Sequence, residues 1–166
     1  MFQNCHNFNQ PINIPNSVID ATNMFFGCTN FNQIVNISNG VINMAYAFNG
    51  CYNLNKPVTI PNSVNNAIYA FYNCNKFNSP VTIGTGVTSV NGLFGFNCHA
   101  MSSNITILAT DVKEVRNMLG GKNYKKRINI IVPAGSKTNN TMAYTNSYSV
   151  VGGTIYWTTN SSNNCR

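Results

Sequence analysis

Residues 47–69 read AFNGCYNLNKPVTIPNSVNNAIY and set the architecture of the chain. The 23 residues that follow, 70–92, read AFYNCNKFNSPVTIGTGVTSVNG and align with them without a gap. On either side of this pair, residues 1–23 and 24–46 fit the same alignment, residues 93–117 fit it with two extra residues, and residues 118–132 form a degenerate sixth unit. A fixed period of this length is typical of repeat proteins, in which each unit covers the core of its neighbour.

Each unit holds one short segment in which apolar and polar residues alternate, for example Val58-Thr59-Ile60. Such alternation in residues of high β-propensity is typical of a strand. Pro15 and Pro61 directly follow two of these segments and are expected to end them. No helical pattern of about ten residues fits into the unit. We therefore expect a β-rich solenoid over residues 1–132, with short parallel strands on one face, loops or single helical turns on the other, and a divergent C-terminal cap over residues 133–166.

The apolar columns of the alignment predict the core and its register, and they place Ile128 opposite Ile105. A further column consists of Cys5, Cys28, Cys51 and Cys74, with Cys98 one place later. Stacked coils would separate these cysteines by about 4.8 Å, whereas a disulfide joins Cβ atoms about 3.8 Å apart, and a straight row cannot surround a tetrahedral metal. We expect a buried, reduced row of cysteines, with a bridge between Cys98 and Cys165 as an open alternative.

The repeat pattern C-x-x-[FL]-N-x-P-[VI]-x-I-P-x-S-V followed by [AM]-F resembles the BspA-like leucine-rich repeats of bacterial surface proteins, some protist surface proteins and phage-encoded proteins. The fragments NFNQ and VINMAYAF are also similar to a related repeat of mycoplasma surface lipoproteins. The resemblance covers residues 1–132. It implies the solenoid fold and a role in binding proteins, glycans or cell surfaces, and it carries no catalytic residue over to this chain.

The composition argues against an enzyme. The 166 residues suffice for one domain, and they include three acidic residues (Asp20, Asp111 and Glu114) and two histidines (His6 and His99) against ten Lys and Arg, for a net charge of +7. General acid–base catalysis relies mostly on histidines and carboxylates, which are scarce here. We expect no enzymatic activity, no cofactor and no metal.

The ends of the chain and its hydropathy suggest where it acts. No run approaches the roughly 18 apolar residues of a membrane-spanning helix, and no basic start leads into an apolar core as in a signal peptide. Together with the resemblance, this predicts a protein of the virion or of the bacterial cell surface or exterior, with no membrane span. Met1 already stands at the first position of a unit. Because terminal repeats normally carry a polar cap, we expect either a fragment of a longer protein or a first coil buried against a neighbouring subunit of an assembly.

The polar middle column of the strands, with a flanking column, is the main candidate for a binding surface. The candidate residues are Gln10, Asn13, Gln33, Asn36, Lys56, Thr59, Thr82, Thr106 and Asn129. Their amides and hydroxyls suit hydrogen bonding to a polar protein surface or to a glycan. The alternative is that they form the solvated side of the sheet and that the asparagines help the coils to stack.

A basic cluster follows the fifth unit, at Lys122, Lys125, Lys126 and Arg127. Such a cluster is either a solvated edge of the domain or a contact for an acidic partner surface. Nucleic acid is a weaker alternative, because Tyr124 fits the apolar core column and does not extend an aromatic platform for bases.

The sequence thus predicts a non-enzymatic recognition or adhesion module that binds a protein or a glycan at a cell or virion surface, including association with a phage tail or particle. The alternative is a purely structural spacer or decoration within a large assembly such as a phage particle, in which the first coil stacks on a neighbour.

Overall fold

The computed structural model describes residues 1–95, 98, 100–114, 118–119, 128–133, 148–151 and 154–157. It is β-rich, and these residues include no helix. The strands are β1 (Ile12–Ile14), β2 (Val35–Ile37), β3 (Val58–Ile60), β4 (Val81–Ile83), β5 (Ile105–Ile107), β6 (Ile128–Ile131), β7 (Tyr148–Val151) and β8 (Thr154–Trp157). The first five coincide with the alternating segments of the repeat, which confirms the prediction of short parallel strands.

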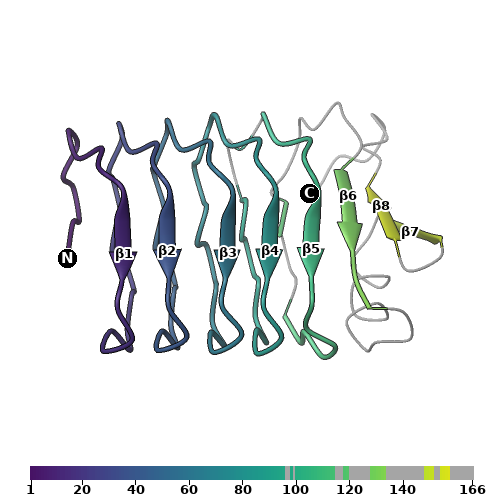
Figure 1. Ribbon diagram of the computed structural model, residues 1–166. Helices are drawn as coiled ribbons and strands as arrows, with labels where there is room; N and C mark the ends of the chain where they lie inside the picture. The colour runs from purple at the N-terminus through teal and green to yellow at the C-terminus, as the bar shows by residue number, and fades with distance from the viewer. Residues whose placement is uncertain are drawn as a thin grey trace.

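The strands from β1 to β5 lie side by side in chain order, and a return segment leads from each strand to the next coil (Figure 1). β1 pairs with β2, and β3, β4 and β5 pair in turn, all in parallel. The return segments were expected to be loops or single helical turns. Where the described return segments meet, they are non-helical and form a second series of parallel bridges. This series runs through Asp20, Asn43, Asn66, Ser89 and Glu114. Except between β2 and β3, neighbouring coils from the first to the fifth are therefore bonded to each other on both sides of the core.

The sheet is interrupted between β2 and β3, which are neighbours without a hydrogen-bonded ladder. At the equivalent points of other coils, the backbone N–H of Ser38 donates to the carbonyl of Ile14 at 3.3 Å, and that of Gly84 donates to the carbonyl of Ile60 at 2.9 Å. Pro61 occupies this place in the third coil and has no N–H to donate. The proline that ends β3 therefore removes one bond of the ladder, and the bridges of the return side keep the two coils together.

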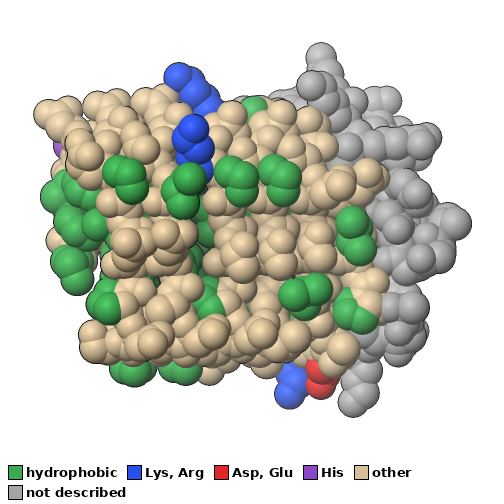
Figure 2. Space-filling model, in the orientation of Figure 1, with side chains coloured by type: hydrophobic (Ala, Val, Ile, Leu, Met, Phe, Trp, Pro, Cys, Tyr) green, Lys and Arg blue, Asp and Glu red, His purple; other side chains and the backbone are tan. Residues whose placement is uncertain are grey.

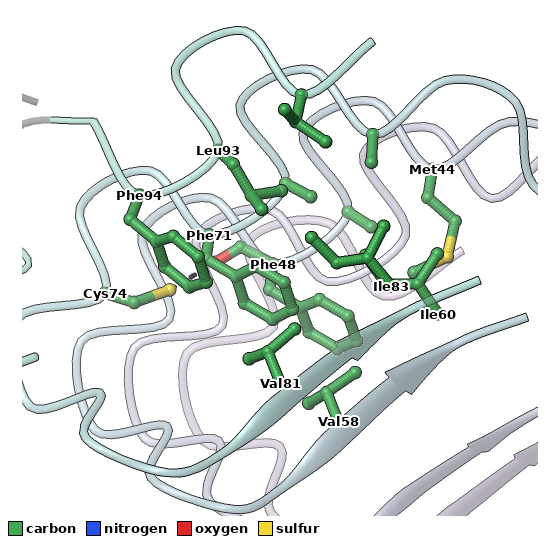
Figure 3. Close-up of a cluster of buried hydrophobic side chains, with 14 of the residues drawn as sticks. Met44, Phe48, Val58, Ile60, Phe71, Cys74, Val81, Ile83, Leu93 and Phe94 are labelled. Carbon is green, nitrogen blue, oxygen red and sulfur yellow. Dashed lines mark hydrogen bonds between the residues drawn. The ribbon is translucent and has the colours of Figure 1, made fainter. Parts of the chain in front are cut away.

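The core lies between the strands and the return segments and repeats the same columns in successive coils (Figure 3). Its centre is a stack of phenylalanine rings. Phe25, Phe48 and Phe71 follow one another with ring centroids 5.3 Å apart and ring planes within 6°, and all three are fully buried. Coils in identical register place identical side chains one above another, and offset stacking of aromatic rings is favourable. The prediction that the apolar columns of the repeat form the core is confirmed for this column.

The first coil is covered on one side only. Phe2, Phe8, Ile12 and Val18 are partly buried, and Met1 is 83% exposed. Figure 2 shows hydrophobic side chains gathered at this end of the molecule. The columns that are fully buried further along the chain are therefore open to solvent on the first coil.

Two turn positions of the coil require a left-handed backbone. The first is occupied by Asn4, Gly27, Gly50 and Asn73, with φ between 59° and 75°. Asparagine and glycine adopt this conformation at the lowest cost, which explains their recurrence there. The second is occupied by Asn23, Tyr46, Tyr69 and Gly92, with φ between 53° and 59°. A bulky residue is rare in this region, so the two tyrosines are backbone outliers.

The register of β6 differs from the sequence alignment by two residues. Ile105 pairs with Ile130 and Thr106 with Ile131, so the expected pairing of Ile128 with Ile105 was wrong. A shift of two residues keeps every side chain on its own face of the sheet, and alternation alone cannot distinguish the two registers. β6 pairs with β8, and β8 with β7, in antiparallel fashion. Apart from Pro133 and these two strands, the predicted cap at residues 133–166 lies outside the described residues.

Candidate recognition surface

The candidate surface is the row of middle residues of β1 to β5, which turn away from the core. Asn13 lies opposite Asn36, and Thr82 lies between Thr59 and Thr106 in the pairing of β3, β4 and β5. Their strand neighbours face inward, so these side chains face outward. Asn13, Asn36 and Thr59 are exposed, and Thr82 and Thr106 are half-buried. Within β1–β2 and within β3–β5, the paired parallel strands space the side chains of the row by about 4.8 Å.

The asparagines and the threonines of this row differ in their hydrogen bonding. Asn36 Nδ2 donates to Asn13 Oδ1 at 2.6 Å. The hydroxyls of Thr59 and Thr82 bond to no other residue in the part of the chain that the structure describes. The asparagines thus help to join two coils, as the alternative interpretation of this column anticipated. The threonines retain their donor and acceptor capacity for a partner.

Asn129 does not lie beside Thr106, because of the two-residue shift of β6. Its Nδ2 instead donates to Asn104 Oδ1 at 3.2 Å. Asn104 precedes Thr106 by two residues, so Asn129 shares the outer face but is displaced toward the start of β5. The sequence assigned this residue to the correct face and to the wrong position in the row.

The flanking column lies in the turns that lead into the strands, three residues before the row. Gln10 is exposed, and Gln33 and Lys56 are half-buried. At the equivalent places, Ser79 Oγ donates to an asparagine side chain at 3.0 Å and Ser103 Oγ donates to a backbone carbonyl at 2.6 Å, each in the preceding coil. The later members of this column therefore join coils, and the first three border the candidate surface.

An exposed apolar row runs beside the polar one and was missed by the sequence reasoning. It consists of Pro11, Ile34, Pro57 and Pro80, all exposed, with Ile34 at 55%. Figure 2 shows hydrophobic side chains set in a line across this face. The signal was present in the sequence, because alternation that points position 13 outward also points position 11 outward. The sheet face thus combines a row of hydroxyls and amides with a row of apolar side chains.

A second series of asparagines fixes the turns before the strands. Asn9 Oδ1 accepts the backbone N–H of Asn32 at 2.9 Å, Asn32 Oδ1 that of Asn55 at 2.8 Å, and Asn55 Oδ1 that of Asn78 at 2.8 Å. Each side chain satisfies a backbone donor of the next coil, as an asparagine in a turn readily does. We refer to these four residues as the asparagine ladder. They account for part of the unusual number of asparagines, 32 in the chain.

The cysteine row is buried and reduced from the second coil onward. Cys28, Cys51, Cys74 and Cys98 are free and buried, whereas Cys5 is exposed. Burial raises the pKa of the Cys51 and Cys74 thiols, and it raises that of Cys98 to about 12. The prediction of a reduced row is confirmed for these four residues, and Cys165 lies outside the described residues.

In the part of the chain that the structure describes, the other chemistry-bearing side chains form no recognisable centre. His6 is exposed, and its Nδ1 lies 2.9 Å from the carbonyl oxygen of Gly27. Within the described ranges, no three His, Cys, Asp or Glu residues are grouped so as to hold a metal ion. The basic cluster of Lys122, Lys125, Lys126 and Arg127 lies outside the described residues, as does His99. Among the residues whose placement is described, no helix has the length and apolar character needed to span a membrane.

Comparison with known proteins gives one family. Residues 1–107 match the family described as "Mycoplasma protein of unknown function, DUF285". No curated protein and no solved structure matches the chain.

Proposed function

The chain belongs to the DUF285 family, and from this premise we propose that it is a non-enzymatic recognition module whose sheet face binds a partner at a cell or virion surface. We also propose that its coils form a leucine-rich-repeat-type solenoid of the BspA-like kind. The parallel register of the strands and the continuous stack of phenylalanine rings support that fold. In a solenoid, one outward position per coil becomes an extended binding surface.

The observation that carries the proposal is that hydroxyls without a hydrogen bond to a described residue lie beside an exposed apolar row on one face. Thr59 and Thr82 offer hydrogen-bonding groups beside the exposed side chains of Pro57 and Pro80. Protein interfaces combine apolar contact with hydrogen bonds in this way and are poor in charge at their centre. The apolar row favours a protein partner, and a glycan is the alternative ligand of the same face.

The test compares binding to cultured animal cells by the natural chain and by a triple variant, Asn36→Ala, Thr59→Ala and Thr82→Ala. We expect the triple variant to lose at least tenfold in affinity while it keeps its circular dichroism spectrum. A matched control changes Asn65, Asn75 and Thr85 to alanine, because these residues are also exposed but lie outside the strands. Equal binding by both triple variants would contradict the proposal.

A purely structural role is a second candidate, and the partly buried apolar side chains of the first coil favour it. Phe2 and Phe8 present partly buried rings at the end of the stack, where a neighbouring subunit could cover them. For this role, Phe2→Glu should release the protein from a large assembly in sedimentation, whereas the sheet-face triple variant should remain in it. For the recognition role, the sheet-face triple variant should lose binding to the partner, and Phe2→Glu should keep it.

A further inference from the structure

We propose that three tyrosines of the return side, Tyr46, Tyr69 and Tyr72, form a stacking site for a neutral sugar ring. We call these residues the tyrosine cluster. It is separate from the sheet face, and the inference does not depend on the function proposed above.

The rings of the cluster form a corner between neighbouring coils. Tyr46 and Tyr69 stack with ring centroids 5.1 Å apart at an interplanar angle of 24°. Tyr72 meets Tyr69 edge-on, at 5.3 Å and 81°. Tyr46 is 36% exposed, and Tyr69 and Tyr72 are half-buried. Tyr46 is therefore the most exposed residue of the cluster, and Tyr69 is contacted by both other rings.

The backbone beneath Tyr46 and Tyr69 does not favour tyrosine. Both residues occupy the left-handed turn position that holds Asn23 in the first coil and Gly92 in the fourth. The first and fourth coils thus have, at this position, residues that prefer the left-handed conformation. Strained residues that persist where an unstrained alternative exists are concentrated at ligand-binding sites. The tyrosines are therefore best explained by what their side chains do.

The rings are held in place before any ligand arrives. Tyr69 lies against Gly92 so closely that a Cβ atom there would collide with its ring. A Cβ atom on Gly95 would lie 2.9 Å from Tyr72 Cδ2. Glycine at these two places leaves the space that the rings occupy. A preorganised aromatic surface loses little conformational entropy on binding.

Two asparagines precede these tyrosines in the chain. Asn43 Oδ1 accepts the N–H of Ala45 and Asn66 Oδ1 that of Ile68, each at 3.1 Å. These bonds fix the two side chains three residues before Tyr46 and before Tyr69. Their Nδ2 groups have no hydrogen bond to any described residue, so they are available to hydroxyl groups.

The chemistry of the site suits a neutral sugar better than a cation. The negative π face of tyrosine attracts the weakly positive C–H bonds on the apolar side of a pyranose, and amide donors can bind its hydroxyls. A cation can also lie over a tyrosine face, and a free carboxylate nearby would strengthen its binding. Asp20 Oδ1, on the return side, already accepts the backbone N–H and the hydroxyl of Thr22. On the return side, the carboxylate of Glu114 is already engaged by Ser89 Oγ at 2.7 Å and by Asn91 Nδ2 at 3.3 Å.

The experiment is saturation-transfer NMR on the full chain with lactose, maltotriose and triacetylchitotriose at millimolar concentration. We expect transfer to the ring C–H protons of at least one of these sugars. Tyr46→Asn and Tyr69→Asn should each abolish the transfer and leave the melting temperature unchanged or raised, because asparagine suits the left-handed backbone. Tyr52→Asn is the matched control, since Tyr52 is 47% exposed but is not in the cluster, and it should retain binding.

Three outcomes would overturn the inference. The first is transfer to none of the three sugars. The second is unchanged binding by Tyr46→Asn and Tyr69→Asn. The third is that these two variants lose a protein ligand and no sugar, which would make the cluster part of a protein interface. The sheet-face triple variant should bind sugar normally, so failure of the recognition proposal and failure of this one remain distinguishable.

Discussion

The thiol of Cys51 donates a hydrogen bond to the carbonyl oxygen of Phe25 in the preceding coil, with 3.1 Å between Sγ and O. The same carbonyl also accepts the backbone N–H of Cys28, at 3.0 Å. Cys74 repeats the arrangement with the carbonyl of Phe48, again at 3.1 Å. The column therefore uses cysteine both as a small apolar residue and as a donor that ties each coil to the one before it.

Replacement of Cys51 tests this bond. Cys51→Ala removes the donor and leaves a small cavity, and we expect a loss of about 1–3 kcal/mol in the free energy of unfolding. Cys51→Ser keeps a donor of similar reach and should cost less than Cys51→Ala. Urea denaturation of the two variants gives the comparison. A serine variant less stable than the alanine variant would mean that the polarity of the hydroxyl outweighs the bond to Phe25.

Alkaline pH should destabilise the fold through the buried thiols. Burial raises the pKa of Cys98 to about 12 from a usual value near 9. Between these values the unfolded chain releases the thiol proton and the folded chain keeps it. The free energy of unfolding is therefore unaffected by this thiol below about pH 9. As the pH rises toward 12, the free energy of unfolding falls by up to about 1.4 kcal/mol per pH unit for one thiol.

The measurement is urea denaturation of the natural chain and of Cys98→Ala at pH 8 and pH 10.5. We expect the natural chain to lose more stability between these pH values than the variant, because the variant lacks one titrating thiol. Equal losses would show that Cys98 keeps an ordinary pKa in the folded state.

The phenylalanine stack should be most sensitive at its centre. Phe48 is fully buried between Phe25 and Phe71, so Phe48→Ala should cost about 3–5 kcal/mol. Phe2→Ala should cost clearly less, because Phe2 is only partly buried and has a ring of this column on one side only. Thermal denaturation of both variants compares their losses of stability. Equal losses would contradict the partial burial of the first coil.

The side-chain oxygens of the asparagine ladder should account for its contribution to stability. Asn55→Ala removes the acceptor of the Asn78 N–H, and we expect a loss of about 0.5–1.5 kcal/mol. Asn55→Asp keeps an oxygen at that place and should remain close to the natural stability. If both variants are equally unstable in urea, the ladder acts through the amide nitrogen and not through the oxygen.

The core could be predicted from the sequence, because stacked coils bring equivalent residues of neighbouring units into contact. Knowing that Phe25 and Phe48 share a position was enough to predict that their rings meet. The register of β6 could not be predicted, since pairing Ile105 with Ile130 or with Ile128 leaves the same residues facing inward.

The candidate site was only partly predictable. The outward direction of Thr59 and Thr82 followed from alternation. Ile34 was overlooked because only the middle strand residues and the flanking column were considered for the outer face, and it is 55% exposed. The conformation of Tyr46 was not predictable, because its left-handed backbone comes from the turn that the neighbouring coils impose.

Site-specific photo-crosslinking is the measurement that examines recognition by the sheet face itself. Benzoylphenylalanine would replace Thr82 on the sheet face in one protein and Asn65, an exposed residue of the return segment, in another. Both proteins would be irradiated on the same cultured animal cells. We predict a discrete adduct from position 82 and none from position 65. Adducts from both positions alike, from position 65 alone, or from neither would contradict recognition through the sheet face.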